Sequence, residues 1–265
     1  VPLLFRIVAA ITFIYLLLPV VIVVLAGLNS GNYLTFPPEG LSLKWLQAFL
    51  TSALFLPAYL YRLRHAFVTM IISTVVGTMT AIFLIRVDFP GRAFVRALFL
   101  APLLLPGLVI GLALYVYYLN LPFLGLSRTF GGMLVGHILV TMPFVIGTVS
   151  ASLYGFDRSL EEAARSLGSG PVRAFMTVTF PNITAGITAG SLFAFIVSFG
   201  QFDLSLMLST PNNTPLPFAM YSSLRYQFEP TSAAAGTFAI ILVVISMILT
   251  SRVTNLSKFG GIKFS

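Results

Sequence analysis

Long apolar segments separated by shorter polar ones run through the whole chain. They occupy residues 7–28, 66–85, 97–119, 132–153, 185–208 and 233–251. Each is close to the length, about 20 residues, that an apolar α-helix needs to cross the hydrocarbon core of a bilayer. The prolines inside some of them are tolerated where neighbouring helices satisfy the freed carbonyl groups. The pattern predicts an all-α integral membrane protein with about six transmembrane helices, forming a single domain over residues 1–265.

The composition agrees with a membrane protein and excludes a soluble globular one. Of the 265 residues, 58% are hydrophobic and 8% are charged, whereas soluble domains carry about 25% charged residues. The chain has no cysteine, which excludes disulfides, thiolate metal sites and cysteine nucleophiles. The net charge is +8, but the basic residues flank apolar segments instead of forming runs. That distribution favours membrane orientation, and we expect the lipid bilayer and no nucleic acid as a partner.

The basic residues divide unevenly between the two faces that six spans create. Ten lie on the face that holds both termini and the polar segment 154–184, and five lie on the other face. Because cytoplasmic loops carry the excess of Lys and Arg, both termini and this segment are predicted to be cytoplasmic. The first apolar segment is too long for a signal-peptide core and lacks a small-residue cleavage site. We therefore expect it to be retained as a span, with further residues ahead of Val1.

Two features between and within the apolar segments bear on packing. Residues 43–56 are amphipathic but too short to cross the bilayer, so we expect them at the interface, with Trp45 and Tyr59 at headgroup depth. Glycines recur at a spacing of four residues, which allows helix backbones to approach closely. This spacing predicts a tightly packed bundle or a dimer face, and the glycine pairs are Gly107/Gly111, Gly132/Gly136 and Gly186/Gly190.

A segment of mixed charge, DRSLEEAARSLGSGPVRAFMTVTFP, occupies residues 157–181. Ser159 and Glu162 have the spacing of a capping box, with Asp157 or Ser159 available to accept the first amide protons of a helix. Gly168 suits the left-handed residue that ends that helix. The sequence predicts a short cytoplasmic helix that ends at Gly168.

A second short helix is predicted directly after the first. Ser169–Gly170 forms a turn, and Pro171 suits the first position of a helix that runs to about Thr179 and ends at Pro181. From the residues alone, the resulting helix–turn–helix block is either a solvated loop or a docking surface for a soluble partner.

The spacing within this block resembles the signature loop of permease subunits of bacterial ABC importers. That loop reads Glu-Ala-Ala, three residues, Gly, nine residues, Ile, one residue, Leu, Pro. Here Glu162, Ala163, Ala164 and Gly168 match it, and the end of the pattern is Val178–Pro181, with Phe180 in the place of Leu. The segments APLLLPGLVIGL (residues 101–112) and GFDRSLEEAARSLG (residues 155–168) look like the spermidine/putrescine-type branch, which also includes permeases for iron(III), phosphonates and opines.

The resemblance implies a type I importer permease fold in a bacterial inner membrane. It implies two ATP-binding subunits, a second permease that is a different, homologous chain, and a periplasmic solute-binding protein as partners. In that family the signature loop is the coupling helix that sits in a groove of the ATPase. The residues that this assigns to ATPase coupling are Glu161, Glu162, Ala163, Ala164, Leu167, Gly168, Pro171, Val178 and Pro181.

Motifs for chemistry within the chain itself are missing. No G-x-x-x-x-G-K-[ST] sequence occurs, so ATP and Mg²⁺ are expected on the partner subunits, with no cofactor in this chain. No H-E-x-x-H sequence occurs either, and His65 and His137 are far apart in the sequence. No catalytic residue and no metal site is therefore predicted, and we expect His137 to be a hydrogen-bonded packing residue that faces the interior of the bundle.

Asp203 is the only acidic residue within a predicted span. Acidic residues in spans are rare and commonly functional, so Asp203, Ser198 and Gln201 are candidates to line a path for a cationic or hydrogen-bonding solute. Alternatively, Asp203 is wetted near the interface or pairs with Arg225.

The resemblance leaves the solute open. Polyamine permeases usually carry two adjacent acidic residues where this chain has Gly200 and Gln201. A polyamine, an opine, an amino acid or a similar small solute therefore fits. The alternative function is a stand-alone secondary carrier or channel.

Overall fold

The computed structural model of the protein describes residues 3–209, 215–226 and 229–254, and within them it is helical. Helices long and apolar enough to cross a membrane include α1 (Leu3–Gly27), α3 (Phe55–Arg86), α6 (Phe130–Tyr154) and α12 (Thr231–Thr254). The continuous helical stretch Pro171–Gly200 is a fifth. Within the described residues this gives five candidate spans, or six if one bent helix pair is a single span. The prediction of an all-α membrane protein with about six spans is confirmed.

The third predicted span, residues 97–119, is not a continuous helix. It consists of α4 (Arg92–Leu100), the 3-10 turn η1 (Ala101–Leu103) and α5 (Gly107–Asn120), with an angle of 104° between its two arms. Pro102 and Pro106 explain the bend, because proline has no amide proton to donate and its ring clashes with the preceding turn.

The fifth predicted span, residues 185–208, is also interrupted. Helix α9 (Phe180–Gly200) ends before Gln201 and Phe202, and α10 (Asp203–Leu208) follows. At its other end, α9 continues directly from α8 (Pro171–Ala174) and the π-helical turn η3 (Phe175–Thr179).

The prediction that Pro181 ends a separate helix is therefore wrong. The π-helical turn accommodates the missing amide proton of Pro181, and the side chain of Asn182 donates to the carbonyl oxygen of Val178 at 2.7 Å.

Two other boundaries differ from the predictions. The predicted interfacial segment 43–56 is divided between α2 (Lys44–Thr51) and the start of α3. Helix α3 begins at Phe55, eleven residues before the predicted start at residue 66. The polar residues Arg62 and His65 are fully buried in the part of α3 ahead of residue 66, and this is why hydropathy alone places the start too late.

The chain divides into two compact units, and the expected single domain stays a prediction. The first unit comprises Val1–Arg62 and Thr214–Ile245, with α1, α2, α11 (Leu216–Tyr226) and most of α12. Its centre includes Phe49, whose ring stacks on Phe238 at 4.5 Å and meets Tyr59 edge-on at 5.6 Å.

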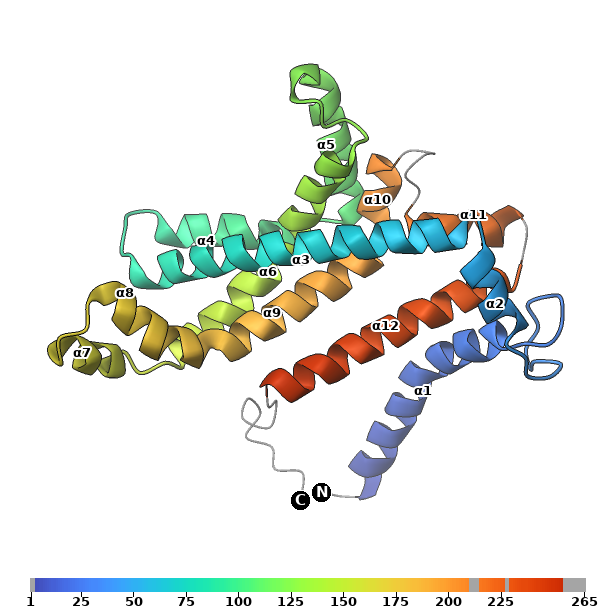
Figure 1. Ribbon diagram of the computed structural model, residues 1–265, viewed down its shortest axis with the longest axis horizontal. Helices are drawn as coiled ribbons and strands as arrows, with labels where there is room; N and C mark the ends of the chain where they lie inside the picture. The colour runs from blue at the N-terminus through green and yellow to red at the C-terminus, as the bar shows by residue number, and fades with distance from the viewer. Residues whose placement is uncertain (1–2, 210–214, 227–228, 255–265) are drawn as a thin grey trace. The chain divides into compact units, whose positions relative to one another are not determined.

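The second unit comprises Leu63–Asn213 and Ser246–Ser265 and carries both candidate sites. Helices α6 and α9 lie side by side in it (Figure 1). A Cβ on Gly190 would lie 2.9 Å from Val145 Cα, so only glycine permits this approach. A buried apolar cluster that includes Ala81, Val149 and Ile183 joins them to α3. The prediction of a tightly packed bundle is confirmed.

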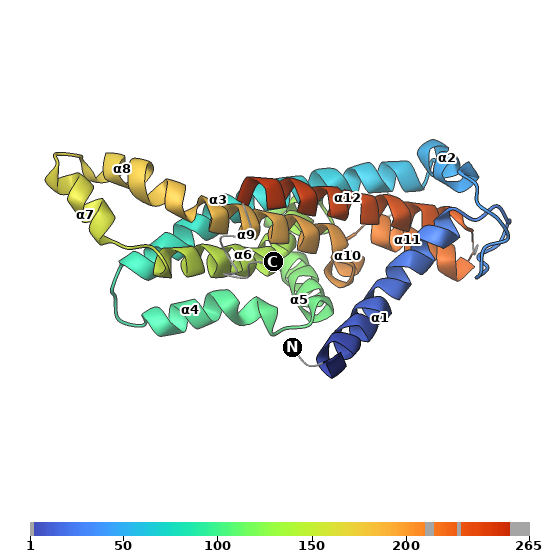
Figure 2. The same cartoon turned by 90° about the horizontal axis from the view of Figure 1, so that it is seen from below.

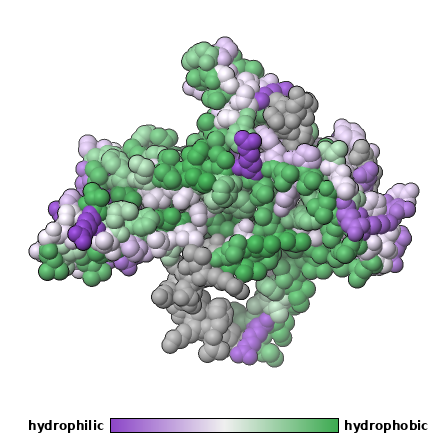
Figure 3. All heavy atoms as spheres, in the orientation of Figure 1, coloured by the Kyte–Doolittle hydropathy of each residue, from purple (hydrophilic) through white to green (hydrophobic). Residues whose placement is uncertain are grey.

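Apolar side chains dominate the surface over the long helices (Figure 3). Helix α1 has no buried residue in its most apolar window. Such a surface requires lipid or protein partners around it.

Candidate functional site

The first candidate site is the block formed by α7 (Ser159–Ser166), α8 and η3, which lies beyond the ends of α6 and α9 (Figures 1 and 2). Helix α7 begins after Asp157, whose Oδ1 accepts the Ser159 amide proton at 2.9 Å. The hydrogen bonds from Ser159 hold the pKa of the Asp157 carboxyl below its ordinary value. The predicted capping box does not form, because the N-cap residue is Arg158, whose carbonyl oxygen accepts the Glu162 amide proton at 3.2 Å.

Gly168 ends α7 in the left-handed conformation, with a φ of 90°, as its position in the sequence predicts. The Gly168 amide donates to the Arg165 carbonyl at 3.0 Å, and the Ser169 amide donates to the Ala164 carbonyl at 3.1 Å. These two bonds define a Schellman motif, which satisfies carbonyl groups left free at a helix end. The sharp turn between α7 and α8 depends on this one backbone conformation.

Glu161 fixes α7 to the spanning helices. Its carboxylate accepts bonds from Arg86 Nη1 at 3.1 Å and Arg86 Nη2 at 2.6 Å, and a further bond from the Thr179 hydroxyl. Arg86 Nη2 also lies 3.2 Å from Thr179 Oγ1. The hydrogen bonds from Arg86 are the largest cause that lowers the pKa of Glu161, and partial burial opposes them. This network joins the end of α3, the first turn of α7 and η3.

The lowered pKa of Glu161 predicts that α7 loosens in acid. A carboxyl group with a lower pKa in the folded state contributes stability that is complete above its unfolded value, here 4.5. That contribution is lost as the pH falls from this value through the lowered pKa. Amide hydrogen exchange of α7, corrected for the intrinsic effect of pH, is expected to accelerate in this window. Glu161→Gln is the control and should flatten the dependence; an unchanged profile in this variant would contradict the role of Glu161.

Several other side chains of the block are exposed. Leu167 is 89% exposed and Val172 is 75% exposed, and Glu162 is also exposed. Large apolar side chains exposed together with a charged one are typical of a surface that binds protein. Of the residues predicted to couple to an ATPase, Glu161 is buried and Ala164 and Val178 are partly buried. The exposed ones are Glu162, Ala163, Leu167, Gly168, Pro171 and Pro181.

The second candidate site is the place where the two interrupted helices meet. Gly107, the first residue of α5, lies against Gln201 in the break between α9 and α10, and a Cβ on Gly107 would collide with the Gln201 amide nitrogen. One turn later, a Cβ on Gly111 would lie 3.1 Å from Leu204 Cα. Non-helical backbone inside a membrane protein is tolerated where protein buries it or where it lines a water-filled cavity. The junction therefore combines unusual backbone with the predicted path residues.

The predicted path residues occupy three different environments at this junction. Asp203 is exposed at the start of α10, Gln201 is partly exposed, and Ser198 is fully buried. Asp203 and Arg225 belong to different compact units, and their alternative pairing stays a prediction.

His137 connects the two sides of the break between α9 and α10. Its Nδ1 lies 2.9 Å from Ser198 Oγ in α9, and its Nε2 lies 3.1 Å from Ser205 Oγ in α10. The Ser205 hydroxyl donates to the Gln201 carbonyl at 2.6 Å, so it accepts from Nε2–H, and Nδ1 accepts from Ser198. The prediction of a hydrogen-bonded, inward-facing His137 is confirmed, whereas the sequence had offered no signal for Ser205.

Replacing His137 with leucine is expected to release α10 from α9. The change removes the hydrogen bonds of His137 to two buried hydroxyl groups, those of Ser198 and Ser205, at a cost of about 2 kcal/mol. Because the chain has no cysteine, a single cysteine placed at the fully buried Leu204 reports on α10. Its maleimide labelling should accelerate in the His137→Leu background. Thr141→Val removes a buried hydroxyl one turn away and should leave labelling unchanged; equal acceleration in both backgrounds would contradict a specific role of His137.

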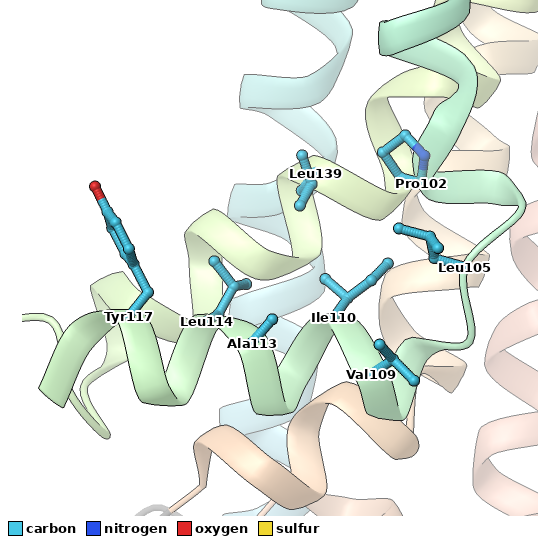
Figure 4. Close-up of a pocket in the computed structure, with 8 residues that line it drawn as sticks. All are labelled: Pro102, Leu105, Val109, Ile110, Ala113, Leu114, Tyr117 and Leu139. Atoms are coloured by element: carbon cyan, nitrogen blue, oxygen red, sulfur yellow. The ribbon is translucent and has the colours of Figure 1, made fainter. Parts of the chain in front are cut away.

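An apolar groove of about 440 Å³ lies beside the bend between η1 and α5 (Figure 4). No charged residue lines it, so it is unsuited to a cationic or zwitterionic solute. Its lining is Pro102, Leu105, Val109, Ile110, Ala113, Leu114, Tyr117 and Leu139. Among the described residues, no group of three His, Asp or Glu side chains is placed to hold a metal ion.

Sequence comparison shows that this chain is similar to transport proteins. Residues 73–257 match the family model described as "Binding-protein-dependent transport system inner membrane component". The chain is 27% identical over 247 residues to the spermidine/putrescine transport system permease protein PotC of Escherichia coli K12, covering 93% of this chain and 92% of that protein. It is 30% identical over 234 residues to the putrescine permease PotI of the same strain, covering 85% and 81%. It is also 30% identical over 215 residues to that strain's molybdenum permease ModB, covering 76% and 94%.

Solved structures share the fold at low sequence identity. A bacterial alginate ABC transporter in complex with an alginate-bound periplasmic protein matches with a TM-score of 0.71 and 14% identity, covering 96% of this chain and 93% of that one. An amino acid ABC transporter matches with a TM-score of 0.58 and 18% identity, covering 78% and 97%.

Proposed function

This chain belongs to the family of inner membrane components of binding-protein-dependent transport systems, and from that membership we propose how it works as a permease of an ABC importer. The observation that carries the proposal is the exposed surface around Glu162 and Leu167 on a block that Glu161 and Arg86 fix to the spans. This surface docks an ATP-binding subunit, and two such subunits serve the transporter. The chain itself contributes no catalytic residue and binds no cofactor, and ATP and Mg²⁺ bind to the partners.

Movement of the ATP-binding subunits reaches the spans through two connections, one covalent and one non-covalent. Helix α8 continues through η3 into α9 without a break in the helical stretch Pro171–Gly200. The Glu161–Arg86 pair joins α7 to the end of α3. A displacement of the block therefore moves α3 and α9 together, because neither connection contains a flexible loop. The remaining partners are a second, homologous permease and a periplasmic solute-binding protein. Both termini and the block face the cytoplasm of the bacterial cell.

The proposed solute is small and cationic or zwitterionic, in the class of polyamines, opines and amino acids. The exposed carboxylate of Asp203 and the partly exposed amide of Gln201 support this class at the junction of the two broken helices. PotC and PotI are spermidine/putrescine and putrescine permeases by name. Asp203 supplies one carboxylate at the start of α10, which suits one positive charge on the solute. The amide of Gln201 nearby can donate to and accept from a compact solute that also forms hydrogen bonds.

Copurification tests the importer assignment against a stand-alone carrier. Tagged protein purified from the cells that naturally make it should retain an ATP-hydrolysing subunit, and Glu162→Lys should release it by reversing the exposed charge. Glu39→Lys, a charge reversal in the connection before α2, is the matched control and should keep the subunit bound. Purification of a functional carrier without any ATPase would contradict the importer assignment.

Asp203→Asn is expected to lower uptake of a cationic solute about tenfold in reconstituted vesicles, because the loss of one close ion pair at the solute costs roughly 1.4 kcal/mol. Radiolabelled putrescine and a neutral sugar are the two probes. The effect should appear mainly in KM, and the amount of assembled complex should not change. Equal uptake by the variant and the original protein would remove Asp203 from the pathway.

A further inference from the structure

A basic hollow lies between α4 and the end of α6, and it shares no lining residue with either candidate site. Its volume is about 550 Å³, and it is lined by Arg92, Ala93, Arg96, Ala97, Leu100 and Tyr154. The two arginines are one helical turn apart on α4, so they share a face. The two alanines on the same side leave the space that larger side chains would fill. Tyr154 is the last residue of α6, and Figure 2 shows α4 running along that helix.

The charge of this hollow is positive and only partly compensated. Arg92 Nη1 bonds Asp88 Oδ1 at 2.5 Å, and Arg92 Nη2 bonds the Ile85 carbonyl at 3.3 Å, which fixes its guanidinium. Arg96 Nη1 donates to the Tyr154 hydroxyl at 3.2 Å, and its Cζ lies 5.9 Å from the centre of that ring. Within the described part of the chain, Arg96 forms no ion pair. Arginine binds phosphate oxygens in a forked, two-bond geometry, so a phosphate group suits this pair.

Several features favour the phosphate of a phospholipid over free inorganic phosphate as the ligand. The hollow lies at the ends of the spanning helices α3 and α6, and tyrosine at the end of a span is typical of headgroup depth. Phe94 is 72% exposed and Leu98 is 61% exposed on α4, so this helix presents large apolar side chains to lipid.

A second, smaller hollow of about 170 Å³ shares Arg96, Leu100 and Tyr154 with the first. Leu84 and Ile146 are among its lining residues, so it offers apolar surface next to the charged site. A charged opening that continues into an apolar recess matches the order of groups in a phospholipid.

The geometry points to a binding site for the phosphate of an anionic phospholipid, formed by Arg92, Arg96 and Tyr154. The proposed function enters only in assigning this lipid to the cytoplasmic leaflet of the membrane. Each Lys or Arg near the membrane surface adds a similar electrostatic attraction for anionic headgroups. A pocket with two arginines at this depth therefore favours an anionic lipid. The bound lipid holds the turn between α3 and α4, close to Arg86.

Native mass spectrometry of the purified transporter complex tests the site. Added phosphatidylglycerol should give more retained adduct than phosphatidylcholine of the same chain length. Arg92→Gln with Arg96→Gln should weaken phosphatidylglycerol binding about thirtyfold, or roughly fivefold for each arginine. The matched control is Arg128→Gln, because Arg128 also lies over a tyrosine ring, that of Tyr115 at 5.0 Å, but outside the hollow. It should leave binding unchanged.

Arg96→Lys is the second variant and keeps the positive charge while losing the forked geometry. It should give intermediate binding and remains informative if the double variant fails to fold. Equal retention of both lipids, or phosphatidylglycerol binding that is the same in Arg96→Lys as in the original protein, would overturn the site. Displacement of phosphatidylglycerol by millimolar inorganic phosphate would show a free-anion site and would also overturn it. None of these results depends on solute uptake, so the site can fail while the importer function stands.

Discussion

Arg86→Met is expected to detach α7 from the spans and to lower coupled uptake by at least tenfold. The change leaves the Glu161 carboxylate, whose side chain is 11% exposed, without its cationic partner. Removing one partner of a buried pair costs about 3–5 kcal/mol, and the lower end applies here because the Arg86 side chain is 24% exposed. A change of about 3 kcal/mol shifts an equilibrium constant by roughly 150-fold. Even a well-docked α7 helix should therefore open measurably.

Limited trypsin cleavage at Arg165, in the last turn of α7, measures this opening directly. Cleavage should accelerate in Arg86→Met, and uptake should fall in parallel. The control is the double variant Arg86→Met/Glu161→Leu, because replacing both partners by apolar side chains is often neutral. Slow cleavage should return in the double variant. Rapid cleavage in both variants, or slow cleavage in Arg86→Met, would show that the pair does not hold the block.

Gly168→Val is expected to abolish most coupled uptake while the protein still inserts into the membrane. At a φ of 90° a non-glycine residue pays about 1–2 kcal/mol, and a β-branched side chain is a genuine outlier there. A Cβ on Gly168 would meet no atom within 4 Å. The damage therefore arises from the backbone, because the new φ changes the direction in which α8 leaves α7.

Gly168→Asn separates the backbone effect from a surface effect. Asparagine adopts the left-handed conformation more readily than other side chains, so this variant should keep most of the uptake. Uptake and copurification with the ATP-binding subunit are the two measurements. Equal losses in both variants would mean that the partner rejects any side chain at this position, and full activity of Gly168→Val would contradict the structural requirement for glycine.

Much of the fold and of the docking block could be predicted, because the signals are local. Apolar length identified the membrane helices, and a glycine in the right place identified the turn after α7. The helix interruptions were missed because hydropathy is averaged over a whole segment: residues 97–119 and 185–208 are both mainly apolar, and the few polar residues of the second do not mark where its helix breaks. Prolines in a span favour a bend but do not fix its angle, which the packing of α5 against α10 determines.

The site residues divide in the same way. The sequence contains Glu161 and Glu162 side by side and gives no reason to assign them different roles. In the fold, Glu161 faces Arg86, 75 positions earlier in the chain, and Glu162 faces outward. No local pattern encodes a contact over that separation.

By itself, the sequence determined that this protein lies in a membrane, that its polar block between two spans resembles an ATPase-docking loop, and that Gly168 turns that block. Composition and short-range backbone preference suffice for these conclusions. The tertiary structure decided which acidic residue fixes the block and which one remains for a partner. It also decided that two helix breaks meet beside Gln201, with His137 joining both sides of one of them. These are contacts between distant segments, and only packing brings their partners within hydrogen-bond distance.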